Sequence, residues 1–248
     1  MRQHLTMITG GTRGIGAATA LRLAAEGHDL VLGYAHDDGA ADGCRRAVEN
    51  LGARCLVVGS DVSDEAGVEE LFSRARSFGL LTAVVNNAGA TMHVGTLAET
   101  PPDIVRPTVE LNLTGALLVA RAAVRALSTS YEGDGGVLVN VSSGAATLGS
   151  PGEYVQYAAA KAGVDAMTAG LGQEVAADGV RVVGVAPGMV RTRIHEDAGD
   201  AGRLERLASQ IPLGRAGAPE EIAAAIAWLL SDEASYVTGT TLRVAGGR

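Results

Sequence analysis

The sequence predicts an α/β fold: a single doubly wound domain over residues 1–248, with helices on both faces of a seven-stranded, mainly parallel sheet. Short apolar runs alternate with longer stretches of helical periodicity along the chain, as in strand–helix–strand units. The strand-like runs are continuously apolar, as expected for parallel strands buried on both faces. No low-complexity linker or internal repeat marks a second domain.

The predicted strands are 5–9, 29–34, 54–59, 83–86, 137–141, 180–185 and 241–244. The predicted helices are 14–26, 38–51, 64–78, 102–129, 154–178 and 219–231. Several boundaries carry local signals. Ser63 and Asp64 supply capping side chains, and Pro219 followed by two acids is typical of a helix start. The Gly-Asp-Gly-Gly stretch at 133–136 predicts the turn into the fifth strand.

Composition and charge exclude several classes of function. The net charge is −8 without a basic cluster, which argues against nucleic-acid binding. No apolar stretch reaches the roughly 20 residues of a membrane span, so we expect a cytoplasmic protein that does not bind membranes. Cys44 and Cys55 lack metal-like spacing and are expected to be free thiols. We expect no catalytic metal, because no metal-ligand spacing joins the histidines at 4, 28, 36, 93 and 195.

A glycine-rich turn joins the first predicted strand to the first predicted helix. It reads Thr-Gly-Gly-Thr-Arg-Gly-Ile-Gly over residues 9–16. Glycines allow a tight turn and let backbone N–H groups approach a pyrophosphate at a helix N-terminus. Such a turn by itself is weak evidence, but this position favours a dinucleotide site over a plain loop.

The only lysine of the chain, Lys161, stands four residues after Tyr157, whereas the other 19 of the 20 Lys and Arg residues are arginines. On a helix this spacing places the phenol and the ammonium on one face. A positive charge so close lowers a tyrosine pKa, which brings acid–base chemistry nearer neutral pH. The alternative is an accidental surface pair, which would arise in about 2% of chains with five tyrosines in 248 residues.

The ordered motifs resemble the short-chain dehydrogenase/reductase family from about residue 5 to residue 247, near its glucose-dehydrogenase-like and acyl-carrier-protein ketoreductase-like members. The motifs are the turn at 9–16, Asp61-Val62, Asn86-Asn87-Ala88-Gly89, Asn112, Ser142-Ser143, Tyr157 with Lys161, and Pro187-Gly188-Met189-Val190-Arg191-Thr192. The resemblance implies a Rossmann-type fold and an oxidoreductase that transfers hydride between a nicotinamide cofactor and a carbonyl or secondary alcohol.

The resemblance also implies four catalytic residues. Tyr157 would exchange a proton with the substrate oxygen, and Lys161 would lower the pKa of Tyr157 and bind the nicotinamide ribose. Ser143 would hold the substrate oxygen, with Ser142 as the alternative. Asn112 would hold a water that relays protons from Lys161, and its alternative is a buried amide that bonds local backbone.

The cofactor-binding residues implied by the resemblance are Gly10, Thr12, Arg13, Gly14, Ile15, Gly16, Ala35, His36, Asp61, Val62, Asn87, Ala88, Gly89, Tyr157, Lys161, Pro187, Gly188, Val190 and Thr192. Asp61 would accept from the adenine amino group, or alternatively cap the next helix. Thr192 would bind the nicotinamide carboxamide. Asn86 is expected to have a structural role, fixing strands through its side chain.

The second predicted strand favours NADP, with NAD use left open. NAD enzymes of this fold have an acid at the end of this strand, and none stands there before His36. Arg13 and His36 could meet a 2′-phosphate, although Arg13 could also be an exposed loop residue. Asp37 and Asp38 would repel a phosphate, so we expect the loop to turn both outward.

The alternative to an oxidoreductase is a catalytically silent homologue that senses a nucleotide or binds a partner. A site for another nucleotide, such as a nucleotide sugar, is a third possibility. The substrate is expected to be a small carbonyl or alcohol beneath a mobile lid at about 189–213. Tyr154 is expected to line the pocket, whereas His93 and His195 are expected on the surface.

Small residues recur on two predicted helices and suggest close helix packing, either on the chain's own sheet or between subunits. They are Ala116, Ala120, Ala122, Ala123, Ala158, Ala162, Ala166 and Ala169. The resemblance implies a homotetramer, with a dimer as the alternative.

Overall fold

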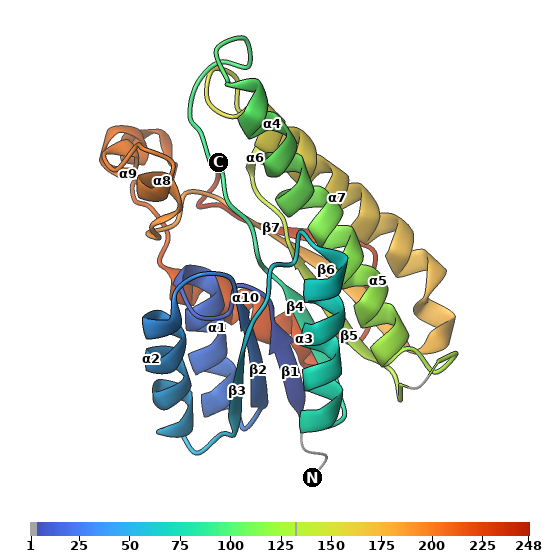
Figure 1. Ribbon diagram of the computed structural model, residues 1–248. Coiled ribbons are helices and arrows are strands. Elements are labelled where there is room, and N and C mark those ends of the chain that lie inside the picture. The colour runs from blue at the N-terminus through green and yellow to red at the C-terminus, as the bar shows by residue number, and fades with distance from the viewer. Residues whose placement is uncertain (1–3, 132) are drawn as a thin grey trace.

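Seven parallel strands form one sheet in the order β3-β2-β1-β4-β5-β6-β7 in the computed structural model, which describes residues 4–131 and 133–248 (Figure 1). The strands are β1 (Leu5–Ile8), β2 (Asp29–Tyr34), β3 (Cys55–Gly59), β4 (Ala83–Asn86), β5 (Gly136–Val141), β6 (Val180–Pro187) and β7 (Thr241–Val244). All seven predicted strands are found, with ends that differ by at most two residues. The predicted α/β fold with a parallel sheet is confirmed.

Helices cover both faces of this sheet. The longer ones are α1 (Gly14–Ala25), α2 (Asp38–Glu49), α3 (Glu65–Phe78), α4 (Pro102–Val109), α5 (Ala116–Leu127), α7 (Val155–Glu174) and α10 (Pro219–Leu230). Figure 1 shows α1, α2 and α10 on one side and α3, α5 and α7 on the other. Successive strand residues alternate between the two cores: Ile8 and Val139 pack on the first side, and Met7 and Leu138 on the second. The strands are continuously apolar because both faces are covered.

The predicted continuous α-helix over 102–129 is wrong in its middle. A π-helical segment, η1 (Glu110–Gly115), separates α4 from α5. Pro107 lies inside α4 and has no N–H to donate, which weakens the regular α-helical ladder just upstream. A Cβ on Gly115 would lie 2.7 Å from the Val62 carbonyl oxygen, so the segment runs against the end of the β3–α3 connection. Such π turns are frequent at functional sites, and this one carries the fully buried Asn112.

The carboxyl ends of β1 and β4 mark the point where the strand order reverses, which is where open α/β sheets bind ligands. The buried Thr9 joins these two ends, because its Oγ1 accepts from the backbone N–H groups of Asn87 at 2.9 Å and Ala88 at 3.0 Å. Asn86 has the predicted structural role: its Nδ2 donates to the Ala116 carbonyl at 2.9 Å and to Asn140 Oδ1 at 3.1 Å.

The segment between β6 and α10 folds into short helices, α8 (Ile194–Asp197) and α9 (Arg203–Leu207). Figure 1 shows them apart from the two helical layers, at the end of the sheet opposite the N-terminus. Leu204 and Leu207 pack on a small apolar cluster that contains Met189 and Ile211. Within the described part of the chain, no helix is long and apolar enough to cross a bilayer.

Candidate functional site

A cleft of about 880 Å³ runs along the carboxyl ends of the strands, from the glycine turn to Tyr157. Nearly all of the predicted site residues line it. They are Gly10, Thr12, Arg13, Gly14, Ile15, Ala35, His36, Asp61, Val62, Asn87, Ala88, Gly89, Ser143, Tyr157, Lys161, Pro187, Gly188, Val190 and Thr192. The exceptions are Gly16 and Asn112, which lie behind the wall of the cleft. Residues from opposite ends of the sequence therefore share one cavity.

The glycine turn has a shape that requires glycine at several positions. Gly10 has a φ of 59°, in the left-handed region. A Cβ on Gly16 would lie 2.2 Å from the Gly10 carbonyl oxygen, so Gly16 serves the close packing of turn and helix. Arg13 is the N-cap of α1 but gives no side-chain cap, and the first turn of α1 has no acid. The N–H groups of the first turn of α1 are therefore available to bind an anion, such as the pyrophosphate of a dinucleotide.

Ser143, rather than Ser142, faces Tyr157. The Ser143 side chain is close enough to the Tyr157 phenol to lower its pKa, whereas Ser142 is buried and its Oγ donates to the Lys161 carbonyl at 3.2 Å. Ser143 Oγ also accepts from the Ala145 backbone N–H at 3.1 Å, which fixes the hydroxyl beyond the end of β5. Ser142 instead ties α7 to the sheet.

Lys161 is buried beneath the ring of Tyr157. Its Nζ donates to the Val141 carbonyl at 2.8 Å and lies 5.8 Å from the centre of the Tyr157 ring. Burial lowers the pKa of Lys161 to about 8, against a partial opposing effect of the Asp165 carboxylate.

The predicted lowering of the Tyr157 pKa is not found in this arrangement. Burial raises the pKa of Tyr157 above its ordinary value, and the neighbouring Ser143 side chain opposes this shift only in part.

Asn112 is bonded entirely to backbone in the hydrogen bonds described. Its Nδ2 donates to the carbonyls of Ala90 at 2.8 Å and Thr108 at 2.9 Å, and its Oδ1 accepts from the Ala90 N–H at 3.2 Å. A Cβ on Gly89 would lie 2.7 Å from Asn112 Oδ1 and 3.3 Å from Lys161 Nζ. Gly89 therefore keeps open the space that Asn112 and Lys161 share. The water relay expected of Asn112 stays a prediction.

Asp61 lines the cleft and is not the cap of α3. Its Oδ1 accepts from the Ser63 N–H at 2.9 Å and the Ser63 hydroxyl at 2.7 Å, and these bonds hold the pKa of Asp61 below its ordinary value. The cap of α3 is Asp64, which accepts from the Gly67 N–H. The geometry thus removes the alternative role as a helix cap, and leaves a fixed carboxylate at the adenine end expected for the cofactor.

The loop after β2 does not turn both acids outward, so this prediction is wrong for Asp37. Asp37 lines the cleft, where its Oδ2 lies 3.8 Å from the guanidinium of Arg13, and its Oδ1 caps α2 by accepting from the Ala40 N–H. Asp38 points elsewhere and accepts from the Tyr34 hydroxyl at 2.8 Å. The cap requirement of α2 explains the position of Asp37, since capping fixes its carboxylate at the helix start. Arg13 is therefore already paired, although both side chains are half exposed.

Sequence reasoning missed the polar contacts at the other end of the cleft. Arg203 of α9 is buried against Glu153 and Tyr154, and all three side chains line the cavity. Tyr154 was expected there, but no local pattern singles out an arginine in a polar segment. His93 is absent from the cleft lining, and the side chain of His195 lies outside the described part of the structure. Among the described residues, no three His, Cys, Asp or Glu side chains are grouped so that they could hold a metal.

Known proteins resemble this chain over nearly its full length. Residues 10–248 match the family model described as enoyl-(acyl carrier protein) reductase. The chain is 43% identical over 245 residues to the uncharacterized oxidoreductase YgfF of Escherichia coli strain K12, covering 98% of this chain and 99% of the relative. It is 38% identical over 244 residues to the L-rhamnose 1-dehydrogenase (NAD(P)(+)) of Sphingomonas sp. strain SKA58, covering 97% and 94%. A short chain dehydrogenase from Burkholderia cenocepacia J2315, solved in complex with NADP, aligns with a TM-score of 0.90 at 31% identity, covering 98% and 97%.

The lowered pKa of Lys161 makes protein stability depend on pH. The folded-state pKa is about 8 and the ordinary value is 10.5, so between these values the unfolded chain binds more protons than the folded protein. Below pH 8 Lys161 is protonated in both states, and the cost of burying its charge lowers the free energy of unfolding in full. The free energy of unfolding of the wild type, relative to Lys161→Met, should therefore rise by about 2 kcal/mol from pH 7.5 to 9.5. Urea unfolding at several pH values measures this difference. The prediction is contradicted if the free energies of unfolding of the two proteins change with pH in parallel.

Proposed function

This chain belongs to the short-chain dehydrogenase/reductase family of oxidoreductases, and we propose that it is NADP-dependent and acts on a carbonyl or secondary alcohol through Ser143, Tyr157, Lys161 and Asn112. One observation carries the proposal. The Tyr157 phenol lies beside Ser143 and above the buried Lys161, in a cleft that is continuous with the glycine turn.

The proposed chemistry assigns one task to each side chain. Tyr157 gives its phenolic proton to the substrate oxygen in reduction and takes it back in oxidation. Ser143 donates to the same oxygen as negative charge develops there. The raised pKa of Tyr157 keeps the phenol protonated at neutral pH in the unliganded protein, and this is the form that reduction requires. Lys161 restores the proton of Tyr157, and Asn112 lies beside Lys161 to hold a water on the way to solvent.

A bound nicotinamide dinucleotide supplies or accepts the hydride. The N-terminal turn of α1 would hold the pyrophosphate, and Asp61 with Val62 would hold the adenine. The chain at Asn87, Ala88 and Gly89 would run beside the cofactor ribose. Pro187, Gly188, Val190 and Thr192 would hold the nicotinamide end. A Cβ on Gly14 would lie 3.2 Å from Thr192 Cγ2, so the Thr192 segment already lies against the glycine turn.

The preference for NADP rests on Arg13 and His36, which line the cleft beyond β2. The Arg13–Asp37 pair is long at 3.8 Å and half exposed, so a 2′-phosphate can replace the carboxylate as the partner of Arg13 at small cost. In the absence of the phosphate, Asp37 is available to a ribose hydroxyl. This arrangement supports use of both cofactors with NADP preferred, and a relative whose name includes NAD(P)(+) is consistent with it.

Assembly into a homotetramer is also part of the proposal. Ala120 and Ala123 belong to this chain's own core and Ala116 is also buried, so these three residues do not report on association. Ala162, Ala166 and Gly170 instead form an exposed stripe of small residues at four-residue spacing on α7. Near the C-terminal strand, Trp228, Tyr236 and Leu242 are exposed and could serve a second interface. Two separate self-complementary surfaces are what a tetramer needs and a dimer does not.

Tyr157→Phe should lower kcat by about 10²–10⁴-fold, because the ring stays but the transferable proton is lost. The assay follows NADPH oxidation with a panel of carbonyl compounds and NADP⁺ reduction with alcohols, including L-rhamnose, the sugar in the name of one relative. Lys161→Arg should also be severely impaired, since the planar guanidinium does not fit the space between Gly89 and Val141.

Tyr131→Phe is the matched control, because Tyr131 is exposed and does not line the cleft. Its kcat should equal that of the wild type, and NADPH binding should survive in Tyr157→Phe and Tyr131→Phe. Near-normal turnover by Tyr157→Phe would refute the proposed role of the phenol, and normal turnover by Lys161→Arg would refute that of the lysine.

Arg13→Ala should weaken NADPH binding about ten-fold, or about 1.5 kcal/mol, and leave NADH binding nearly unchanged. Asp37→Ser should have the opposite effect on NADPH, since it removes the competing carboxylate. Fluorescence titration of each cofactor measures both variants. Equal losses of the two cofactors in Arg13→Ala would show that Arg13 does not read the phosphate.

Light scattering at micromolar concentration should give a mass about four times the 25.1 kDa subunit. Ala166→Arg places a large charged group in the exposed stripe of α7 and should reduce the assembly to smaller species. A monomeric wild type would contradict the tetramer and its alternative, the dimer.

A further inference from the structure

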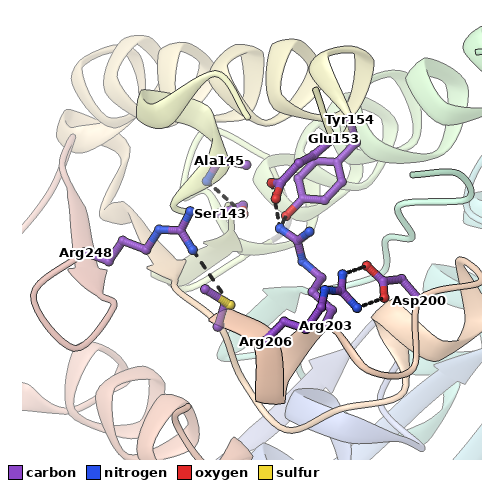
Figure 2. Close-up of polar contacts among 9 residues, drawn as sticks. Ser143, Ala145, Glu153, Tyr154, Asp200, Arg203, Arg206 and Arg248 are labelled. Carbon is purple, nitrogen blue, oxygen red and sulfur yellow. Dashed lines mark hydrogen bonds and ion pairs between the residues drawn. The ribbon is translucent and has the colours of Figure 1, made fainter. Parts of the chain in front are cut away.

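Arg203 joins α9 to the residues that precede α7 (Figure 2). Its Nη2 donates to Glu153 Oε2 at 2.6 Å and to the Tyr154 hydroxyl at 2.9 Å. Its guanidinium carbon lies 5.0 Å from the centre of the Tyr154 ring. The Arg203 side chain is only 3% exposed, whereas that of Glu153 is 24% exposed. A cation from the segment after β6 is thus almost fully enclosed at the substrate end of the cleft.

Tyr154 carries this contact to the reacting end of the site. Its ring meets that of Tyr157 edge-on, with centroids 5.5 Å apart and planes at 89°. Such an arrangement is a favourable contact between aromatic rings. On the other side, the Glu153 carbonyl accepts from the Gly95 N–H at 2.7 Å, which anchors the turn before α7. The side chain of Arg203 therefore touches a fixed carboxylate and a ring that packs on Tyr157.

The free energy of the Arg203–Glu153 contact is compatible with a segment that closes over the cleft and reopens. Burying a guanidinium costs hydration free energy that a single ion pair repays only in part. Arg203 Nε is buried without a hydrogen-bond partner among the described residues, so the contacts of Arg203 offset only part of its lost hydration. On opening, Arg203 regains water, and Glu153 is already partly exposed. The short helix α9 is otherwise held by Leu204 and Leu207 against a small apolar cluster. The Arg203–Glu153 ion pair is therefore one of the contacts that hold this segment, beside the apolar cluster and the bond from Thr91 Oγ1 to the Ile194 carbonyl.

We propose that Arg203 is a positioning residue that latches α9 over the substrate end of the cleft and holds Tyr154 against Tyr157. The latch sets the affinity for the carbonyl substrate without touching the reacting atoms. This inference rests on the proposed function, in which Tyr157 exchanges a proton with the substrate. It also gives the expected lid at 189–213 a specific closing contact.

Arg203→Gln and Arg206→Gln form a matched pair of variants. Arg206 lies one turn along α9, and its guanidinium pairs with Asp200 at 2.6 Å rather than with Glu153 or Tyr154 (Figure 2). With Arg203→Gln we expect KM for the carbonyl substrate to rise about ten-fold or more, while kcat and NADPH affinity change less than about three-fold. Arg206→Gln should leave all three values within about two-fold of the wild type, as for an exposed pair. Arg203→Lys should fall between the two, because a lysine keeps the charge but lacks the planar fork.

Loss of folded protein would lower kcat and leave KM unchanged, so the split between KM and kcat separates a latch from a merely structural role. Tyr154→Phe keeps the ring and removes only the hydroxyl that accepts from Arg203, and it should also raise KM. This variant provides the test if Arg203→Gln does not fold. Equal KM values for wild type, Arg203→Gln and Tyr154→Phe would overturn the proposal.

Hydrogen–deuterium exchange of residues 194–210 tests the latch without any activity. Exchange in this segment should be faster in Arg203→Gln than in the wild type, and unchanged in Arg206→Gln. If the wild type turns over no carbonyl or alcohol with either cofactor, the proposed function fails, and the exchange data still decide whether Arg203 holds the segment. Identical exchange in all three proteins would overturn the latch.

Discussion

Lys161 carries an ammonium group into the interior because the Val141 carbonyl, at the end of β5, accepts a hydrogen bond from its Nζ at 2.8 Å. The rest of the site is arranged around this bond. Gly89 leaves room beside the ammonium, Ser142 Oγ ties the Lys161 backbone to the sheet, and the ring of Tyr157 covers Nζ at 5.8 Å. A wide guanidinium would not fit this space, which gives a physical reason for a lysine in a chain that otherwise uses arginine.

The two ends of the cleft use arginines in opposite ways. Arg13 and Asp37 are half exposed and 3.8 Å apart, so water screens them and a ligand can separate them at small cost. Arg203 is enclosed and bonded at 2.6 Å to Glu153, so breaking that contact changes the position of a whole segment. The first pair is suited to a choice between cofactors, and the second to a closure over the substrate. Arg13 and Asp37 lie just before α1 and α2, whereas Arg203 begins the short helix α9 in the segment after β6.

The sequence was sufficient for features that depend on local pattern. The strands follow from continuous apolar runs, and the site position follows from the glycine turn and the Tyr157–Lys161 spacing. Features that depend on tertiary contacts were not predictable. The π turn around Asn112 reflects packing against the β3–α3 connection, and the place of Asp37 reflects its second task as a helix cap. The raised pKa of Tyr157 reflects burial, which spacing along a helix does not report. Arg203 acquires its partners only when α9 folds back against the turn before α7.

Ionisation of Tyr157 in the unliganded protein tests most directly whether burial or the nearby lysine controls this site. Lys161, with a pKa of about 8, loses its charge before a tyrosine of ordinary pKa 10 would ionise, so burial should prevail. The measurement is the difference in ultraviolet absorbance between wild type and Tyr157→Phe during a pH titration. We expect Tyr157 to stay protonated through pH 10. Ionisation of Tyr157 well below pH 10 would show instead that the ammonium of Lys161 outweighs burial.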